Sequence, residues 1–233
     1  MTWSVHEYAH DSELVKALAH EVVQALSRAI AARGRASIAV SGGSTPVALF
    51  KTLSDAQLEW DKVVVTLVDE RWVPETDADS NARLVRTHLL VERAASARFV
   101  SLKTDNTDPF LATFDVEATL HLKVLPLDVV LLGMGEDGHT ASFFPAAKGA
   151  REALETQERV CCAVRPRTAP HDRMTLSLAT ILSAAQLFLH IIGEPKKQVL
   201  DHAMNAGSIE KMPVRAVLHQ DKVPLQIYYA KEK

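Results

Sequence analysis

Three short apolar runs, each followed at once by a polar or glycine-rich loop, constrain the fold of this 233-residue chain most strongly. The runs are "SIAV" at 37–40, "VVVTLVD" at 63–69 and "LDVVLLG" at 127–133. The second run is β-branched and does not alternate with polar residues, which is typical of a strand covered on both faces in a parallel sheet. Because helical segments lie between the runs, we expect a three-layer α/β fold, with a mostly parallel, Rossmann-like sheet flanked by helices.

Apolar spacing and capping residues predict the helices. Residues 12–33 carry apolar side chains at intervals of four on one helical face, and Gly34 is a plausible end. Shorter helices are expected to begin at Thr45 and Pro46, at Ser80, at Asp108 and Pro109, and at Pro195. In the helix after Pro109 we expect Phe110, Phe114 and Leu120 to be buried. Further strands are predicted at 160–164, 173–178, 187–192, 214–218 and 225–229.

The rest of the chain indicates one domain over residues 1–233, since no repeat, linker or low-complexity tract interrupts the pattern. The net charge of −3 gives no sign of a nucleic-acid partner. The apolar stretch 178–193 is short and carries polar residues, so we interpret it as a buried helix and strand and expect no membrane partner.

Two features concern the cellular compartment. Cys161 and Cys162 are adjacent, which favours buried thiols over a long-range disulfide. The N-terminus "MTWSVHEYAH" lacks the basic start and apolar core of a signal peptide. We therefore expect a cytoplasmic protein.

The loops after the three apolar runs should lie together, because sites in open parallel sheets form beyond the carboxyl ends of the strands. In "SGGSTP", the residues Ser41, Gly42, Gly43 and Ser44 offer free amides and hydroxyls to an anion. The loop is neither a Walker loop nor GxGxxG, and a plain turn before a helix explains the local pattern equally well.

The second loop, "DERWVPETDADSN", begins with Asp69, Glu70 and Arg71. Such charges at a strand end often only reach solvent, but three of them at an expected sheet edge favour a site weakly. We expect no metal, because an arginine stands beside the acids and no histidine or cysteine pair has ligand spacing.

The third loop, "GMGEDGHTASFFP", is the most specific. Glycines 133, 135 and 138 lie close to His139, the usual residue type for proton transfer near neutral pH. Asp137, two residues earlier, could orient the imidazole or tune its pKa, but the sequence does not show whether the two touch. Taken alone, a loop histidine is more often a surface residue. Arg173 and Lys196 are two cations near expected strand ends, and each could equally be a solvated surface charge.

Together the three loops resemble the short bacterial-type 6-phosphogluconolactonases, of the glucosamine/galactosamine-6-phosphate isomerase superfamily. The motifs "SGGSTP", "VDERWVP…DSNARL" and "LLGMGEDGHTASFFP" stand in the order and spacing of that family, and the resemblance spans nearly the whole chain. Phe143, where leucine is usual, and Pro195, where glutamate is common, are small departures that remove no reacting group.

The resemblance implies the sugar-phosphate isomerase/lactonase type of fold and hydrolysis of 6-phospho-D-glucono-1,5-lactone, without a cofactor, in the oxidative pentose phosphate pathway. It implies His139 as the general base, with Asp69 and Arg71 at the reacting end. It further implies the "SGGS" loop, Arg173 and Lys196 as phosphate-binding groups; Lys197 is the neighbour that motif register disfavours.

Two rival functions remain at this point. A glucosamine-6-phosphate deaminase-like isomerase also has a "DGH" loop, but that loop continues into a Phe-Asn-Glu-Pro segment with a catalytic glutamate that is missing here. A non-catalytic sugar-phosphate sensor would keep the phosphate loop and lose the base. A monomer and a small homo-oligomer are both compatible with the sequence.

Overall fold

The strands divide between two sheets. Within residues 3–167 and 169–232, which the computed structural model describes, a seven-stranded parallel sheet accompanies a three-stranded antiparallel one. In spatial order the large sheet consists of β1 (Trp3–His10), β10 (Leu225–Glu232), β9 (Gln186–Ile192), β6 (Val129–Leu132), β2 (Ala36–Val40), β3 (Val63–Leu67) and β5 (Arg98–Phe99). The small sheet consists of β4 (Asp69–Arg71), β8 (Arg173–Leu176) and β7 (Cys161–Val164).

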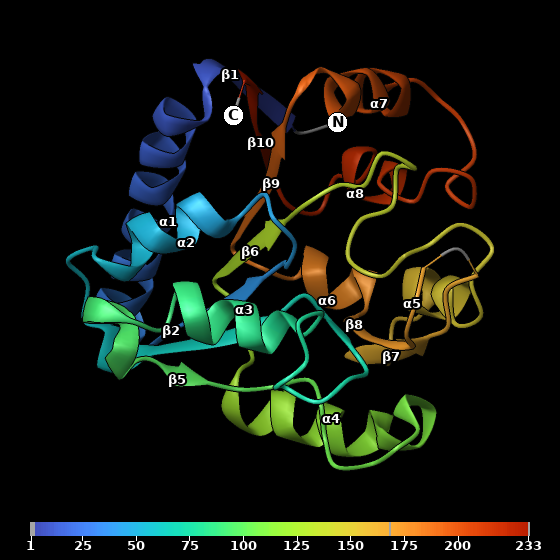
Figure 1. Ribbon diagram of the computed structural model, residues 1–233, viewed down its shortest axis with the longest axis horizontal. Helices are drawn as coiled ribbons and strands as arrows, with labels where there is room; N and C mark the ends of the chain where they lie inside the picture. Colours follow the sequence, from blue (N-terminus) through green and yellow to red (C-terminus); the bar gives the residue numbers. More distant parts are fainter. Residues whose placement is uncertain (1–2, 168, 233) are drawn as a thin grey trace.

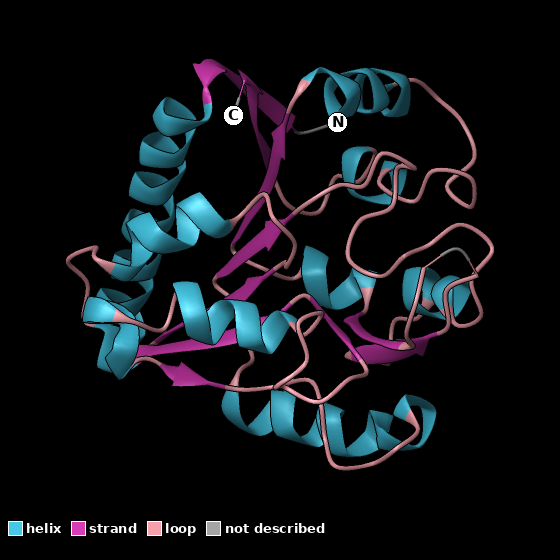
Figure 2. Cartoon of the chain, viewed as in Figure 1, coloured by secondary structure: helices cyan, strands magenta, loops and turns pink. Residues whose placement is uncertain are grey.

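Helices cover both faces of the large sheet, so the three-layer α/β prediction is confirmed (Figures 1 and 2). The helices are α1 (Asp11–Arg33), α2 (Val47–Ser54), α3 (Asn81–His88), α4 (Pro109–Lys123), α5 (Ala150–Glu155), α6 (Leu178–Leu182), α7 (Glu194–Met204) and α8 (Arg215–Leu218), with 3₁₀ turns at Trp60–Lys62 and Glu92–Ser96. Figure 1 shows the large sheet between α1 and α2 on one side and α7 and α8 on the other. As predicted, α1 buries its apolar line and is followed by Gly34, whose N–H donates to the Ile30 carbonyl at 2.7 Å.

The order of the strands determines where a site can form. From β2 the chain continues outward through β3 to β5, and it then returns to β6 on the other side of β2. Two neighbouring parallel strands whose connections leave in opposite directions have a crevice at their carboxyl ends, where α/β proteins bind ligands. The loops after β2, β3 and β6 therefore lie side by side, as the sequence predicts.

The run at 63–69 is not one strand. β3 ends at Leu67, and β4 begins at Asp69 and pairs antiparallel with β8. Val68 joins the two sheets, because its N–H donates to the Val40 carbonyl at 2.9 Å and its carbonyl accepts from Leu176 N–H at 2.8 Å. The change of sheet rotates the residues after Val68 into the crevice, and nothing in an apolar run signals it.

Two other expectations about single elements are wrong in whole or in part, and one strand was missed. The run 214–218 forms the short helix α8, because a buried apolar run of this length suits a helix as well as a strand. Leu120 is buried as expected, but Phe110 is only half-buried and Phe114 is 74% exposed, since the buried line of α4 runs through Ala112, Val116 and Leu120. The edge strand β1 was not predicted, and it pairs with β10.

The apolar stretch 178–193 forms α6 and then β9, as expected. None of the helices in the described part of the chain combines the length and apolarity needed to cross a membrane. Cys161 and Cys162 are buried free thiols in β7, and burial raises the pKa of the Cys162 thiol to about 12.

Candidate active site

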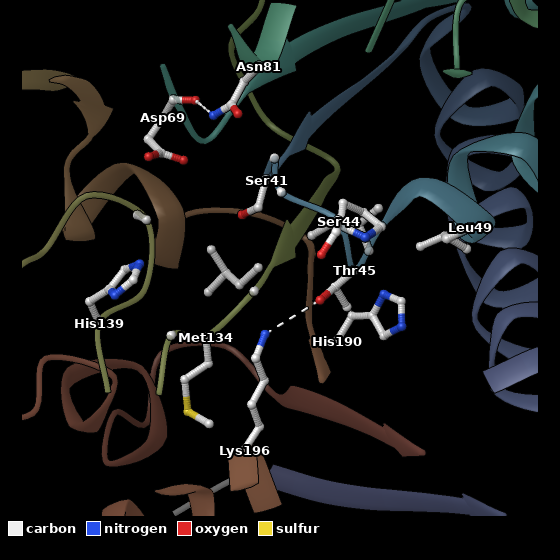
Figure 3. A pocket seen from close by; sticks show the side chains of 18 of the residues that line it. Ser41, Ser44, Thr45, Leu49, Asp69, Asn81, Met134, His139, His190 and Lys196 are labelled. Atoms are coloured by element: carbon white, nitrogen blue, oxygen red, sulfur yellow. Dashed lines mark hydrogen bonds between the residues drawn. The ribbon is translucent and has the colours of Figure 1, made fainter. Parts of the chain in front are cut away.

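A cavity of about 280 Å³ opens at the carboxyl ends of the central strands. It has two ends, which Figure 3 shows on opposite sides of the space. The His139 end comprises His139, Asp137, Asp69 and Arg71, and the Lys196 end comprises Ser44, Thr45, His190 and Lys196. Ser41, Gly42, Gly43 and Met134 line the wall between them.

Several contacts fix the imidazole of His139. Its Nδ1 lies 2.5 Å from Asp137 Oδ1, and its backbone N–H donates to the same oxygen at 3.1 Å. Its ring stacks on Phe144 with 4.4 Å between the ring centres. The hydrogen bond with His139 holds the pKa of the Asp137 carboxyl below its usual value. A carboxylate only accepts hydrogen bonds, so Nδ1 carries a proton, and in the neutral imidazole the free lone pair is then on Nε2.

Two of the three loop glycines are required by this arrangement. A Cβ on Gly135 would overlap the imidazole of His139, which lies across its backbone. Gly138 has φ +77°, which favours glycine, and a Cβ there would lie 2.5 Å from Met212 Cγ. A Cβ on Gly133 would meet nothing within 4 Å. Gly135 thus makes room for the imidazole of His139, and Gly138 provides a left-handed turn packed against Met212.

The segment 140–145 fastens this loop to its surroundings. The Thr140 hydroxyl donates to the Gly133 carbonyl at 2.8 Å and closes the loop. The Ser142 hydroxyl donates to Asp69 Oδ2 at 2.6 Å, which joins the loop to β4. With Phe144 against the imidazole, alternate residues of "TASFF" set the geometry of the His139 end.

The strand β4 directs its three charged residues to alternate sides. Asp69 and Arg71 line the cavity, as predicted, whereas Glu70 points away and is 1% exposed. The Glu70 carboxylate accepts from Asn81 N–H at 2.8 Å and Ala82 N–H at 2.7 Å, so it caps α3. Burial raises the pKa of Glu70 despite these bonds.

Asn81 is a residue that sequence analysis missed. It stands in the quoted "DSNARL" segment, and it lines the cavity with its amide donating to the Asp69 carbonyl at 2.8 Å. A Cβ on Gly42 would overlap this amide, so Gly42 allows the loop after β2 to approach β4. The signal in the sequence that could have identified Asn81 was its position directly after the helix cap Ser80.

The Lys196 end has fewer internal contacts. Lys196 Nζ lies 3.4 Å from Thr45 Oγ1, and burial lowers the pKa of its ammonium. Thr45 was expected to cap the next helix, but α2 begins at Val47 without a side-chain cap. Lys197, by contrast, bonds Asp201 at 2.6 Å.

Arg173 is not among the described residues that line the cavity. It is 4% exposed, and its Nη1 donates to the carbonyls of Pro170 at 2.5 Å and His171 at 2.8 Å. Its register partner across β4 and β8 is Arg71, so the two arginines lie side by side on one face of the small sheet. A phosphate-binding role for Arg173 stays a prediction.

His190 is a second cavity histidine that sequence analysis missed. It lies in β9, and Figure 3 shows its ring beside Thr45. The available signal was a histidine inside the apolar run "FLHII", close to the end of a strand.

Three comparisons with known proteins all identify similarity to 6-phosphogluconolactonases. Residues 9–225 match the family described as glucosamine-6-phosphate isomerases/6-phosphogluconolactonase. The 6-phosphogluconolactonase of Rhizobium meliloti strain 1021 is 47% identical, over 99% of this chain and 100% of that protein. That of Mesorhizobium japonicum is 45% identical, over 94% of this chain and 91% of that protein. The crystal structure of a 6-phosphogluconolactonase from Shewanella baltica OS155 has a TM-score of 0.95 and 42% identity, covering 97% of each chain.

Proposed function

Because the chain belongs to the family of glucosamine-6-phosphate isomerases and 6-phosphogluconolactonases, we propose that it hydrolyses 6-phospho-D-glucono-1,5-lactone to 6-phospho-D-gluconate. The observation that carries the proposal is the oriented His139–Asp137 pair in one cavity with Lys196, in a chain that matches lactonases over its whole length. The reaction belongs to the oxidative pentose phosphate pathway.

His139 is the base in this proposal. A lactone is an activated ester, so its hydrolysis requires a positioned water, a base and stabilisation of charge at the carbonyl oxygen. Nε2 of His139 takes a proton from water while the water oxygen attacks C1. The imidazolium so formed then protonates the ring oxygen as the C1–O bond breaks, and Asp137 stabilises the imidazolium meanwhile. General base assistance of this kind contributes roughly 10²–10⁴ in rate.

Asp69 and Arg71 serve the same end of the substrate. The Arg71 guanidinium is proposed to stabilise the oxyanion that develops at C1. Ser142 occupies one oxygen of Asp69, at 2.6 Å, which leaves the other oxygen for a hydroxyl of the sugar. Both residues come from β4, so the change of sheet at Val68 supports their placement beside His139.

The Lys196 end is proposed to bind the phosphate. Lys196 supplies a charge-assisted hydrogen bond, and Ser41, Gly42, Gly43 and Ser44 supply amides and hydroxyls. Binding energy from this remote group fixes the sugar ring for attack at C1.

The deaminase alternative is not favoured. Its loop carries a glutamate after the histidine, whereas here Thr140, Ser142 and Phe144 use those positions to fasten the loop. Asp69 is the one acid among the described residues that line the cavity. The named relatives with the highest identities are lactonases.

Compartment and assembly are further parts of the proposal. We propose a cytoplasmic location, which the buried free thiols of Cys161 and Cys162 support. We also propose that the chain acts as one domain, in a monomer or a small homo-oligomer.

The test measures two reactions and one binding equilibrium of the purified protein. Freshly generated lactone should release acid well above the spontaneous rate, and glucosamine 6-phosphate should release no ammonia. Binding of 6-phosphogluconate without hydrolysis of the lactone would instead support the sensor, and ammonia release would support the deaminase.

A further inference from the structure

Two buried side chains behind the Lys196 end carry polar atoms that have no hydrogen bond within the described part of the chain. His190 is 3% exposed, and neither of its ring nitrogens has a hydrogen-bond partner among the residues that the structure describes. Within the same described residues, Oδ1 of Asp11 also lacks one. This oxygen lies 3.8 Å from His190 Nε2, which is too long for a hydrogen bond but close enough for an ion pair.

Such a group of atoms is unusual in a protein interior. Roughly 90% or more of buried polar groups have a hydrogen-bond partner, and an unpaired one costs about 1–3 kcal/mol. Tyr228, at the neighbouring register position on β10, fills the same sheet face with a ring that stacks on His6. An aromatic side chain would therefore suit packing at this depth, and the unpaired imidazole indicates a task other than packing.

The charge of the expected ligand suggests that task. A phosphate monoester carries about −1.5 to −2 near neutral pH. Among the described residues that line the cavity, the basic ones are Arg71, His139, His190 and Lys196. The first two stand at the His139 end, so Lys196 by itself would leave such a ligand about half neutralised. An imidazolium at position 190 supplies a second positive charge.

The geometry of the pair fits this assignment. An imidazolium has two N–H donors. Nε2 faces Asp11, the first residue of α1, and Nδ1 is the second donor, buried just inside the cavity wall that His190 lines. A ligand reaches Nδ1 when the ring shifts toward the cavity, and no hydrogen bond from the described residues opposes that shift. Carboxylates orient histidine ligands of metals in the same way.

We propose that His190, oriented by Asp11, binds the phosphate of the substrate together with Lys196. This rests on the proposed function, because it takes the phosphosugar as the ligand. One strand–turn–helix unit, β9 to α7, then supplies both cations of the phosphate site, and α1 supplies their counter-charge.

The test is calorimetric binding of 6-phosphogluconate and of gluconate to the wild type, His190→Leu and Asp11→Asn, with Tyr228→Phe as the matched control. His190→Leu should weaken 6-phosphogluconate binding about ten- to hundredfold, the loss of one charge-assisted hydrogen bond of about 1.5–3 kcal/mol. Asp11→Asn should weaken it a few-fold, and gluconate binding should be unchanged in both. In turnover, KM for the lactone should rise with little change in kcat.

Several outcomes would overturn the inference. Affinity for 6-phosphogluconate within twofold of the wild type in a folded His190→Leu variant would do so, as would equal losses for gluconate. If His190→Leu does not fold, Asp11→Asn and His190→Asn decide on the same readouts. If the wild type neither binds 6-phosphogluconate nor hydrolyses the lactone, the proposed function itself is wrong. If the wild type is active but the variants bind 6-phosphogluconate as tightly as it does, only this inference is wrong.

Discussion

The two ends of the cavity differ in how firmly their side chains are held. At the His139 end, Asp137, Phe144 and the bare backbone of Gly135 fix the imidazole from three directions. At the Lys196 end, the ammonium has one long contact to Thr45, and His190 has no hydrogen bond among the described residues. Groups that transfer protons need a set geometry before the substrate arrives, whereas groups that bind an anion gain their partners from it.

The two ends also differ in how the chain builds them. The 13 residues of "GMGEDGHTASFFP" supply the histidine, its partner and its stacking ring. The Lys196 end joins the loop after β2 to the turn after β9, with Asp11 of α1 behind it. A site within one short segment can be recognised from the sequence, whereas a site built from distant segments can be recognised only from the fold.

Removing His139 should give the largest effect. His139→Ala should lower kcat/KM for the lactone by roughly 10²–10⁴, because the base is lost, while 6-phosphogluconate still binds at the other end. Enzyme-dependent acid release, corrected for spontaneous hydrolysis, measures this. His121→Ala, at an exposed position of α4, is the control and should retain full activity. Wild-type turnover in His139→Ala would show that the base is elsewhere.

Lys196→Met probes the other end. Loss of a charge-assisted hydrogen bond to phosphate should lower kcat/KM about ten- to hundredfold, mainly through KM. The matched control is Lys197→Met, since Lys197 pairs with Asp201 and does not line the cavity. Steady-state kinetics of both variants would decide between the neighbours, and a larger defect in Lys197→Met would reverse the assignment.

Ser142→Ala tests whether the contact between the two loops matters. It would leave Oδ2 of the buried Asp69 carboxylate without its 2.6 Å hydrogen bond, at a cost of about 1–3 kcal/mol in the free energy of unfolding. Activity should fall several-fold, as Asp69 loses its orientation. Ser54→Ala removes a buried hydroxyl bonded within α2, away from the cavity, and should leave activity intact. Urea denaturation and turnover, measured together, separate the two effects.

Asp137→Asn should give the smallest change, because an amide oxygen can still accept from Nδ1. The pKa of Asp137 is lowered, so its orienting carboxylate is present at every pH above roughly 4 and is lost only as the pH falls through the lowered value. The turnover of Asp137→Asn should therefore lie a few-fold below that of the wild type across the neutral pH range. The pH–rate profiles of the two proteins measure this, and equal turnover at neutral pH would show that the Asp137 carboxylate does not orient His139.

Features of the fold that depend only on residues close together in the sequence were predictable. The spacing of α1 and the caps at Ser80 and Asp108 depend on neighbouring residues, and those helices begin where expected. The meeting of the three loops followed from the rule that parallel strands share their carboxyl edge. The sequence left open whether His139 and Asp137, two residues apart, are in contact, and the structure shows that they are.

Features that depend on tertiary context were not predictable. The change of sheet at Val68 depends on bonds to Val40 and Leu176, far away in the chain. Phe114 faces outward because the position of α4 on the small sheet, not its residue type, selects the buried line. His190 lines the cavity because the fold brings the end of β9 close to the loop after β2, which the sequence does not indicate.

The most direct test of the contrast between the ends compares the phosphorylated lactone with unphosphorylated glucono-1,5-lactone in the wild type, His139→Ala and Lys196→Met. If the His139 end performs the chemistry and the Lys196 end binds the phosphate, His139→Ala should lower kcat/KM for both lactones by the same factor. Lys196→Met should lower it for the phosphorylated lactone alone. An equal loss on both lactones in Lys196→Met, or a loss confined to the phosphorylated one in His139→Ala, would contradict this division of the cavity.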